Sequence, residues 1–280
     1  MNSVELYNQI SHKSAEIITK RYSSSFSLGI KLLAKRIQNP IYSIYGYVRL
    51  ADEIVDTFHD QDKKLLLEEF RLETLKSLDR KFSVNPIIHA FQQVVDTYNI
   101  PHQLIFDFLT SMRMDLEGKA YDEELYKSYI YGSAEVVGLM CLHVFSDGEN
   151  DKFEELEPYA RSLGAAFQKV NFLRDFKDDY EKRGRVYFPG VDFEHFSEEG
   201  KKQIEQDIEK DFHNALIGIK KLPRDSRLGV FLAYQYYRKL TQKIVDESAV
   251  SLQNKRIRIS NSRKIFILVK SYIRHNLNWY

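Results

Sequence analysis

The chain has very little of several features that would place it in other protein classes. Its 280 residues contain a single cysteine, Cys141, which excludes an internal disulfide framework and any metal site built on several cysteine ligands. No stretch approaches 18 consecutive apolar residues, and the N-terminus lacks the charged head and apolar core of a signal peptide. We therefore expect a cytoplasmic protein that at most associates with the surface of a membrane.

An excess of charge of either sign is also missing. The sequence has 41 Lys and Arg residues against 40 Asp and Glu residues, for a net charge of +1. Because no long basic tract or bulk positive field is present, we expect no nucleic-acid partner. No Gly, Ser or Pro-rich linker divides the chain, and 43% hydrophobic residues are ample for one large core. We predict a single domain over residues 1–280.

Apolar residues recur at spacings of three and four along nearly the whole chain, whereas strand-like alternation is short and rare. This pattern predicts an all-α fold. The expected helices cover about 3–20, 24–36, 41–58, 62–79, 86–98, 102–118, 123–145, 152–182, 199–221, 225–250 and 262–277. Pro40, Pro86, Pro101, Pro189 and Pro223 are expected at helix boundaries.

Two acidic pairs share one spacing. Asp52 and Asp56 lie in RLADEIVD, and Asp175 and Asp179 lie in NFLRDFKDD. On a helix, carboxylates four residues apart project from one face. With 40 acidic residues in the chain, roughly six such pairs are expected by chance, but these two occur in apolar stretches where an unpaired carboxylate is costly. Facing each other, the pairs could hold several Mg²⁺ ions and a diphosphate.

Polar and cationic residues accompany these pairs. Gln168 and Asn171 precede Asp175 and Asp179 at spacings of three, four and four, so that all four form a polar stripe on an otherwise apolar helix. The cations that could complete a diphosphate shell are Arg49, Arg174, Arg185, Arg256 and Lys264. Plain alternatives stay open, since Arg49 or Arg174 could form ordinary salt bridges worth a few tenths of a kcal/mol. Gln168 could be a buried amide between helices.

Five segments resemble the squalene and phytoene synthase family. They are YSSSFS (22–27), YxxxRLADEIVD (45–56), YIYGSAEVVG (129–138), QKVNFLRDFKDDYEKRGRVYFP (168–189) and RIRISNSRK (256–264). The segments occur in the family's order, span roughly 240 of the 280 residues, and include one long motif that is highly specific. The resemblance implies a class I isoprenoid synthase fold, which is a helical bundle around a central cavity.

The resemblance also implies roles for individual residues. Mg²⁺, with Mn²⁺ as a substitute, is expected on Asp52, Asp56, Asn171, Asp175 and Asp179. The expected substrate-binding residues are Ser23, Ser25, Phe26, Arg49, Gln168, Asn171, Arg174, Tyr236 and Arg256. Aromatic faces stabilise a carbocation in a water-free pocket, and we rank Tyr45 and Tyr129 first as catalytic residues beside the four aspartates. Ser23 and Ser25 could equally be helix N-caps.

Two further positions qualify this pattern. Asp115 matches another acidic position of the family near the cavity. The first acidic motif has Glu53 where many family members have a second aspartate, but the pair at positions 52 and 56 survives. We expect Glu53 to affect only the surroundings of the metal ligands.

The implied reaction joins two identical allylic diphosphates head to head. Geranylgeranyl diphosphate would give phytoene, and NADPH is then not expected. A farnesyl-diphosphate-using squalene or dehydrosqualene synthase is the nearest alternative, and a non-catalytic helical relative is a third. The chain has no N-x-x-x-S-x-x-x-E motif of terpene cyclases and no G-x-G-x-x-G fingerprint. Residues 265–280 are amphipathic and basic, so they could dock on a membrane or simply pack as a terminal helix.

Overall fold

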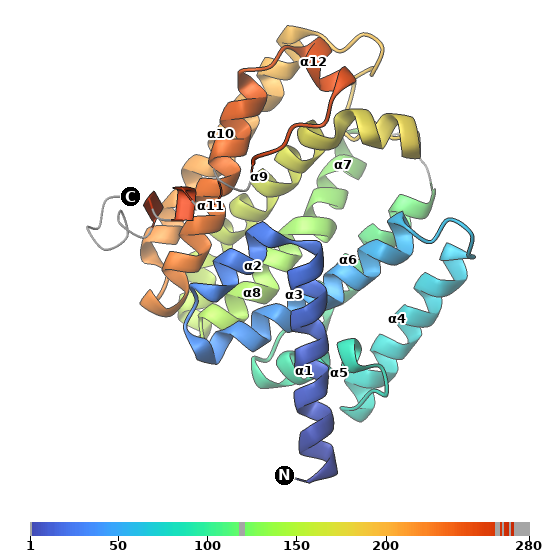
Figure 1. The fold of residues 1–280 in the computed structure, drawn as a ribbon, viewed down its shortest axis with the longest axis vertical. Helices are drawn as coiled ribbons and strands as arrows, with labels where there is room; N and C mark the ends of the chain where they lie inside the picture. Colours follow the sequence, from blue (N-terminus) through green and yellow to red (C-terminus); the bar gives the residue numbers. More distant parts are fainter. Residues whose placement is uncertain (1, 118–120, 261–263, 265, 269, 272–280) are drawn as a thin grey trace.

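The chain folds into a bundle of helices (Figure 1). The computed structural model describes residues 2–117, 121–260, 264, 266–268, 270 and 271. The helices are α1 (Ser3–Tyr22), α2 (Ser24–Lys31), α3 (Lys35–Asp56), α4 (Lys63–Arg80), α5 (Pro86–Thr97), α6 (His102–Glu117), α7 (Glu123–Ile130), the π-helix η1 (Tyr131–Glu135), α8 (Val136–Phe145), α9 (Asn150–Arg183), α10 (Glu198–Lys221), α11 (Arg224–Val245) and α12 (Ala249–Asn254). No strand occurs among these described residues, so the predicted all-α fold is confirmed.

Local capping signals set most of the helix ends. The Asn85 side chain accepts hydrogen bonds from the backbone N–H groups of Ile87 and Ile88, and Pro86 occupies the first turn of α5. Helix α9 ends at Gly184, whose φ of 63° is the left-handed conformation that glycine adopts without steric cost. Most of the predicted helix bounds therefore agree with the structure to within one or two residues.

The prediction that Pro40 marks a helix boundary is wrong. Helix α3 begins at Lys35, and Pro40 lies inside it. A proline here removes one backbone hydrogen bond, the one that the carbonyl of Arg36 would accept. Ile37, Ile41 and Ile44 on the same helix are buried, and this packing outweighs the lost bond.

The predicted helix over residues 123–145 is divided into α7, η1 and α8. At the π-helical turn Gly132 lies against α6, where an added Cβ would come within 2.7 Å of the Asp107 carbonyl oxygen. A turn of this kind inserts one extra residue and changes which side chains face inward. By length and composition Glu123–Phe145 is apolar enough to cross a membrane, but it packs on α6 and α9 with 44% of the tested window buried.

Three further predicted helices differ from the structure. The helix expected over 24–36 ends at Lys31, and α3 already begins at Lys35. The helix expected over 225–250 ends at Val245, and a separate short helix, α12, follows from Ala249. The one expected over 262–277 lies mostly outside the described residues.

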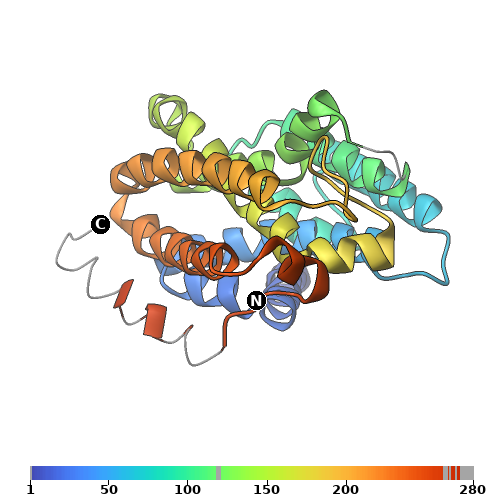
Figure 2. The ribbon, with the colours of Figure 1, turned by 90° about the horizontal axis from the view of Figure 1, so that it is seen from above.

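The buried apolar side chains form two hydrophobic cores, and in the view of Figure 2 helices α10 and α11 lie side by side. The first core is formed mainly by α1 to α6 with α8, and the second by α7 and α9 to α12. Helix α9 runs along the middle, where it packs on α8, α10 and α11, while α2 packs on α11. The acidic pairs predicted to bind metal thus lie on α3 in the first half and on α9 in the second.

Candidate active site

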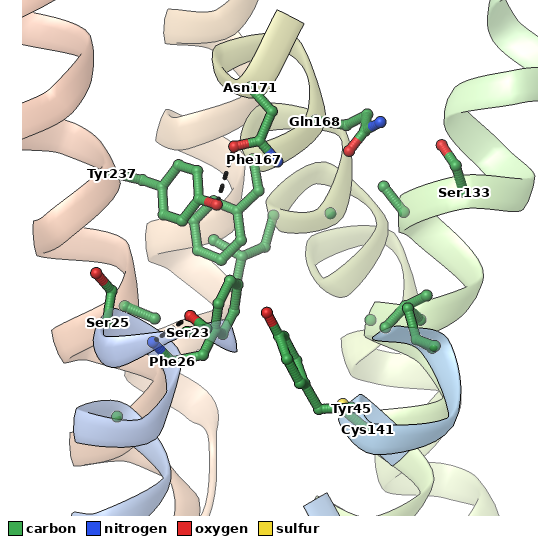
Figure 3. A pocket seen from close by; sticks show the side chains of 18 of the residues that line it. Ser23, Ser25, Phe26, Tyr45, Ser133, Cys141, Phe167, Gln168, Asn171 and Tyr237 are labelled. Atoms are coloured by element: carbon green, nitrogen blue, oxygen red, sulfur yellow. Dashed lines mark hydrogen bonds between the residues drawn. The ribbon is translucent and has the colours of Figure 1, made fainter. Parts of the chain in front are cut away.

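A cavity of about 900 Å³ lies between the two halves. Its wall extends from Tyr22 at the end of α1 to Lys264 near the C-terminus. Among the predicted site residues, Arg185 is not part of this wall, whereas the following residues line it: Ser23, Ser25, Phe26, Tyr45, Arg49, Asp52, Asp56, Tyr129, Gln168, Asn171, Arg174, Asp175, Asp179, Tyr236 and Arg256. Figure 3 shows part of this wall, with side chains from α2, α3, α8, α9 and α11 directed into one space. The structure therefore brings the predicted residues together, while their individual roles stay predictions.

The two acidic pairs are joined across the cavity by an arginine that the sequence analysis did not select. Nη2 of Arg183 lies 2.9 Å from Oδ2 of Asp56, and its Nη1 donates to Oδ1 of Asp179. Helices α3 and α9 are thus linked by one guanidinium. Arg183 lies four residues after Asp179, which is the same spacing that separates the two aspartates of each acidic pair. This spacing was the sequence signal that could have identified Arg183 as a neighbour of Asp179.

Asp175 is paired with two other arginines. The neighbouring Arg174 binds it in a two-pronged contact, and Nε of Arg256 lies 2.6 Å from its Oδ1. Lys264 donates to Oγ of Ser24 at 2.7 Å and lies 5.7 Å from the centre of the Tyr236 ring. Two predicted cations, Arg174 and Arg256, therefore pair with Asp175, while a third, Lys264, lies beside Ser24 and Tyr236.

Arg49 lies beside the first acidic pair. Its Nη1 is 3.9 Å from Oδ2 of Asp52, and its Nη2 pairs with Glu53, which is only 6% exposed. The guanidinium lies 4.5 Å from the centre of the Tyr22 ring, and its Nε is buried without a hydrogen-bond partner. The salt bridge left open as an alternative is thus present, while 27% of the Arg49 side chain stays exposed on the cavity wall.

Burial perturbs the aspartates in the cavity. It raises the pKa of Asp52 to about 7 against the opposing effect of Arg49, and it raises the pKa of Asp179 to about 7 against that of Arg183. About a third of the Asp52 side chain, 34%, remains accessible, but this surface faces the cavity wall opposite. Charged carboxylates are therefore costly here unless a cation joins them.

The donor set fits a hard divalent cation. Carboxylate and amide oxygens are what Mg²⁺ prefers, and Asp52, Asp56, Asp175, Asp179 and Asn171 all line the cavity. In the part of the chain that the structure describes, no three Asp, Glu, His or Cys side chains converge on one point as they stand. Arg183 accounts for this, because it lies between Asp56 and Asp179.

The raised pKa values predict how the stability of the metal-free protein depends on pH. A carboxyl whose pKa is raised on folding stabilises the folded state at low pH, and this stabilisation is lost as pH rises from about 4 towards 7. We expect the Asp52→Asn variant, tested in chelator by thermal denaturation, to unfold at a higher temperature than wild type at pH 8 but not at pH 4.5. Parallel pH profiles for the two proteins would contradict this.

Aromatic side chains form the wall next to the polar groups (Figure 3). The Phe26 and Tyr45 rings are 5.2 Å apart between centres, and the Phe167 and Tyr237 rings stack at 3.9 Å. The hydroxyl of Tyr237 donates to Oδ1 of Asn171 at 3.1 Å. Phe167 and Tyr237 were missed by the sequence analysis, which selected the adjacent Tyr236.

Tyr129 is held by a buried network around Asp115. Its hydroxyl donates to Oδ2 of Asp115 at 2.6 Å, and Tyr187 donates to Oδ1 at 3.1 Å. Nη1 of Arg185 lies 3.1 Å from Oδ1 of Asp115, and both residues are almost inaccessible. Arg185, a predicted diphosphate contact, therefore lies behind the cavity wall and acts as the counter-ion of Asp115 instead.

Smaller polar groups complete the cavity. Oγ of Ser23 accepts a hydrogen bond from the Phe26 N–H at 3.2 Å, so Ser23 is an N-cap of α2 as well as a wall residue. Gln168 on α9 faces Ser133 on the π-helical turn (Figure 3), and Oγ of Ser133 is buried without a partner. Cys141 also lines the cavity.

Sequence comparison connects this site to known enzymes. A sequence model of squalene/phytoene synthases matches residues 19–263. The 4,4'-diapophytoene synthase of Staphylococcus haemolyticus is 27% identical over 216 residues, which are 74% of this chain and 70% of that protein. The chloroplastic phytoene synthase 1 of Solanum lycopersicum is 30% identical over 278 residues, covering 91% and 66%, respectively. The 15-cis-phytoene synthase of Synechococcus elongatus is 28% identical over 286 residues, covering 92% and 91%.

Solved structures share the fold. The crystal structure of a dehydrosqualene synthase gives a TM-score of 0.83 over 98% of both chains at 24% identity. That of a squalene synthase from Alicyclobacillus acidocaldarius gives 0.73 at 19% identity, covering 89% of this chain and 97% of that one. The chain therefore belongs to the squalene/phytoene synthase family, whose members are prenyltransferases that condense prenyl diphosphates head to head and generally use a divalent metal.

Proposed function

We propose that this protein condenses two molecules of geranylgeranyl diphosphate to phytoene through a cyclopropylcarbinyl diphosphate. The observation that carries the proposal is one cavity that is lined by two acidic pairs, a set of arginines and several aromatic side chains. Its volume of about 900 Å³ is near the top of the range of roughly 300–1,000 Å³ for small-molecule sites, as two long-chain substrates require.

Ionisation of the first substrate breaks its C1–O bond, and the electron pair leaves with the diphosphate. Mg²⁺ held by Asp52, Asp56, Asn171, Asp175 and Asp179 would neutralise this leaving group. Arg49, which lines the cavity beside Asp52, is the side chain that we assign to a diphosphate oxygen beside α3. Arg174 and Arg256, which pair with Asp175, have the same role beside α9.

The allylic cation is then attacked by the double bond of the second substrate, and a proton is lost as the cyclopropane ring closes. A second ionisation, a rearrangement and a final proton loss give the hydrocarbon. Phe26, Tyr45, Phe167 and Tyr237 supply ring faces that stabilise a passing positive charge and exclude water. Because the product forms by proton loss and no hydride is transferred, NADPH is not expected.

The choice of a C20 substrate is supported by relatives named phytoene synthase, which align over more than nine-tenths of this chain. The relative named 4,4'-diapophytoene synthase and the dehydrosqualene synthase fold neighbour favour the alternative, a C15 substrate. One methylene in an apolar pocket is worth only about 1–3 kcal/mol, so chain length must be measured.

Purified protein incubated with Mg²⁺ and geranylgeranyl diphosphate, without NADPH, is expected to yield a C40 hydrocarbon identified by mass spectrometry. Chelation of the metal is expected to abolish the product. A C30 product from farnesyl diphosphate, with no C40 product, would reject the C20 assignment. If neither substrate reacts, and Asp52→Ala and Asp175→Ala leave Mg²⁺-dependent binding of inorganic pyrophosphate unchanged, the protein is a non-catalytic relative.

We also propose that the enzyme is cytoplasmic. Two roles stay open for residues 265–280: packing as a terminal helix, which the burial of Ile267 in the second core supports, and contact with a membrane, where the hydrocarbon product would partition. Most of this segment lies outside the described residues. If residues 265–280 contact a membrane, their deletion should reduce co-sedimentation of the protein with anionic liposomes. Unchanged co-sedimentation would reject membrane contact by this segment.

A further inference from the structure

Arg183 occupies the space between the two acidic pairs. It lies at the end of α9, one turn after Asp179, and its guanidinium contacts carboxylates of both helices. Asp179 is 5% exposed, and the Arg183 side chain is about one-third exposed. The contact is therefore partly withdrawn from water, where an ion pair is stronger than on an open surface.

Arg183 and a divalent cation compete for the same two carboxylates, because both carry positive charge and repel each other at short distance. Oδ2 of Asp56 and Oδ1 of Asp179 are the atoms that the guanidinium engages, and both residues belong to the proposed metal-binding set. A cation that binds Asp56 and Asp179 together is therefore expected to displace the guanidinium that lies between them. The displaced guanidinium would then need a new anionic partner, and its planar fork fits phosphate oxygens as well as carboxylates.

We propose that Arg183 is an internal counter-cation of the metal-free enzyme, displaced when metal and diphosphate enter together and then paired with the diphosphate. The inference rests on the proposed metal and diphosphate site. It predicts that metal alone binds weakly and that metal and diphosphate strengthen each other's binding, because only diphosphate offers Arg183 a replacement partner. Such coupling is reciprocal and typically amounts to about 5–150-fold.

The neighbouring Lys182 offers a matched control. It carries the same charge and lies one residue away on the same helix, but it pairs with Asp178 at 2.9 Å and is 69% exposed. Lys182→Gln therefore removes one positive charge from the same region without touching Asp56 or Asp179. Any effect of bulk charge on metal binding should be shared by both variants.

The test measures two affinities for wild type, Arg183→Gln and Lys182→Gln. The first is the Kd for Mn²⁺ alone, from the electron paramagnetic resonance signal of the free ion. The second is the Kd for inorganic pyrophosphate at saturating Mn²⁺, from equilibrium dialysis. We expect Arg183→Gln to bind Mn²⁺ about tenfold more tightly and pyrophosphate about tenfold more weakly, with Lys182→Gln close to wild type.

In Arg183→Gln the affinity for Mn²⁺ is expected to rise while the affinity for pyrophosphate falls. A loss of structure would instead weaken both affinities. Unchanged or weaker Mn²⁺ binding by Arg183→Gln would overturn the inference, as would an equal effect of Lys182→Gln. If wild type binds no Mn²⁺ even with pyrophosphate present, the proposed metal site itself fails, and the inference fails with it.

Discussion

Replacing Asp179 with asparagine is expected to lower the turnover of prenyl diphosphate by about 10³-fold, the upper end of the range for removing one group that stabilises developing charge. Asp179 lines the cavity from α9 and is joined to Asp56 on α3 through Arg183. Asparagine keeps the shape but removes the negative charge that would hold a divalent cation. The measurement is kcat for hydrocarbon formation at saturating Mg²⁺, with folding checked by circular dichroism.

Asp178 is the control for this variant. It is adjacent in sequence but pairs with the exposed Lys182 at 2.9 Å, and its Oδ2 lies 3.8 Å from Nη1 of Arg256. Asp178→Asn should change kcat by no more than about threefold, since exposed pairs contribute less than about 1 kcal/mol. Equal losses of kcat in the two variants would argue against a metal ligand at position 179.

The helical fold could be predicted from the sequence because each helix presents an apolar face. Ile37, Ile41 and Ile44 repeat at helical spacing and are buried as that spacing requires. The same periodicity could not place the start of α3, because it does not reveal that packing outweighs the hydrogen bond lost at Pro40. Nor could it reveal the π-helical turn at Tyr131–Glu135, where one additional residue alters the register without interrupting the apolar run.

The cavity wall was predicted more completely than the contacts within it. Motif resemblance selected residues from α2, α3, α7, α9, α11 and the segment after α12, and all of them line one cavity. It could not distinguish which of Arg183 and Arg185 faces the acidic pairs, because both carry the same charge two residues apart. Their partners are set by the turn at Gly184, where α9 ends and the chain changes direction.

Tyr236 and Tyr237 show the same limit. Adjacent residues on a helix point about 100° apart, so one position decides which ring meets Asn171. Tyr237 donates to Asn171 and stacks on Phe167, whereas Tyr236 lies beside Lys264. Only the rotation of α11 against α9 separates these roles, and that rotation is a property of the assembled bundle.

Asp115→Ala is expected to lower the free energy of unfolding by about 3–5 kcal/mol, the usual cost of removing one partner of a buried ion pair. The substitution leaves Arg185, whose side chain is 11% exposed, without its counter-charge. It also removes the acceptor of the Tyr129 and Tyr187 hydroxyl groups. Urea denaturation measures the loss, with Glu68→Ala as the comparison because its pair with Arg71 is exposed and should contribute less than about 1 kcal/mol.

A double variant separates the cost of an unpaired charge from the contribution of the network. If the unpaired Arg185 causes most of the loss, Asp115→Leu combined with Arg185→Leu should be more stable than Asp115→Leu alone, because no charge stays buried without a partner.

Tyr129→Phe keeps the Asp115 and Arg185 pair and should cost only about 1 kcal/mol of stability, typical of one hydrogen bond. A fall in kcat for Tyr129→Phe without a matching fall in stability would assign the phenol to the reaction and Asp115 to its positioning. Stability losses of equal size in Asp115→Ala and Glu68→Ala would instead show that Asp115 does not hold Tyr129 and Arg185 in place.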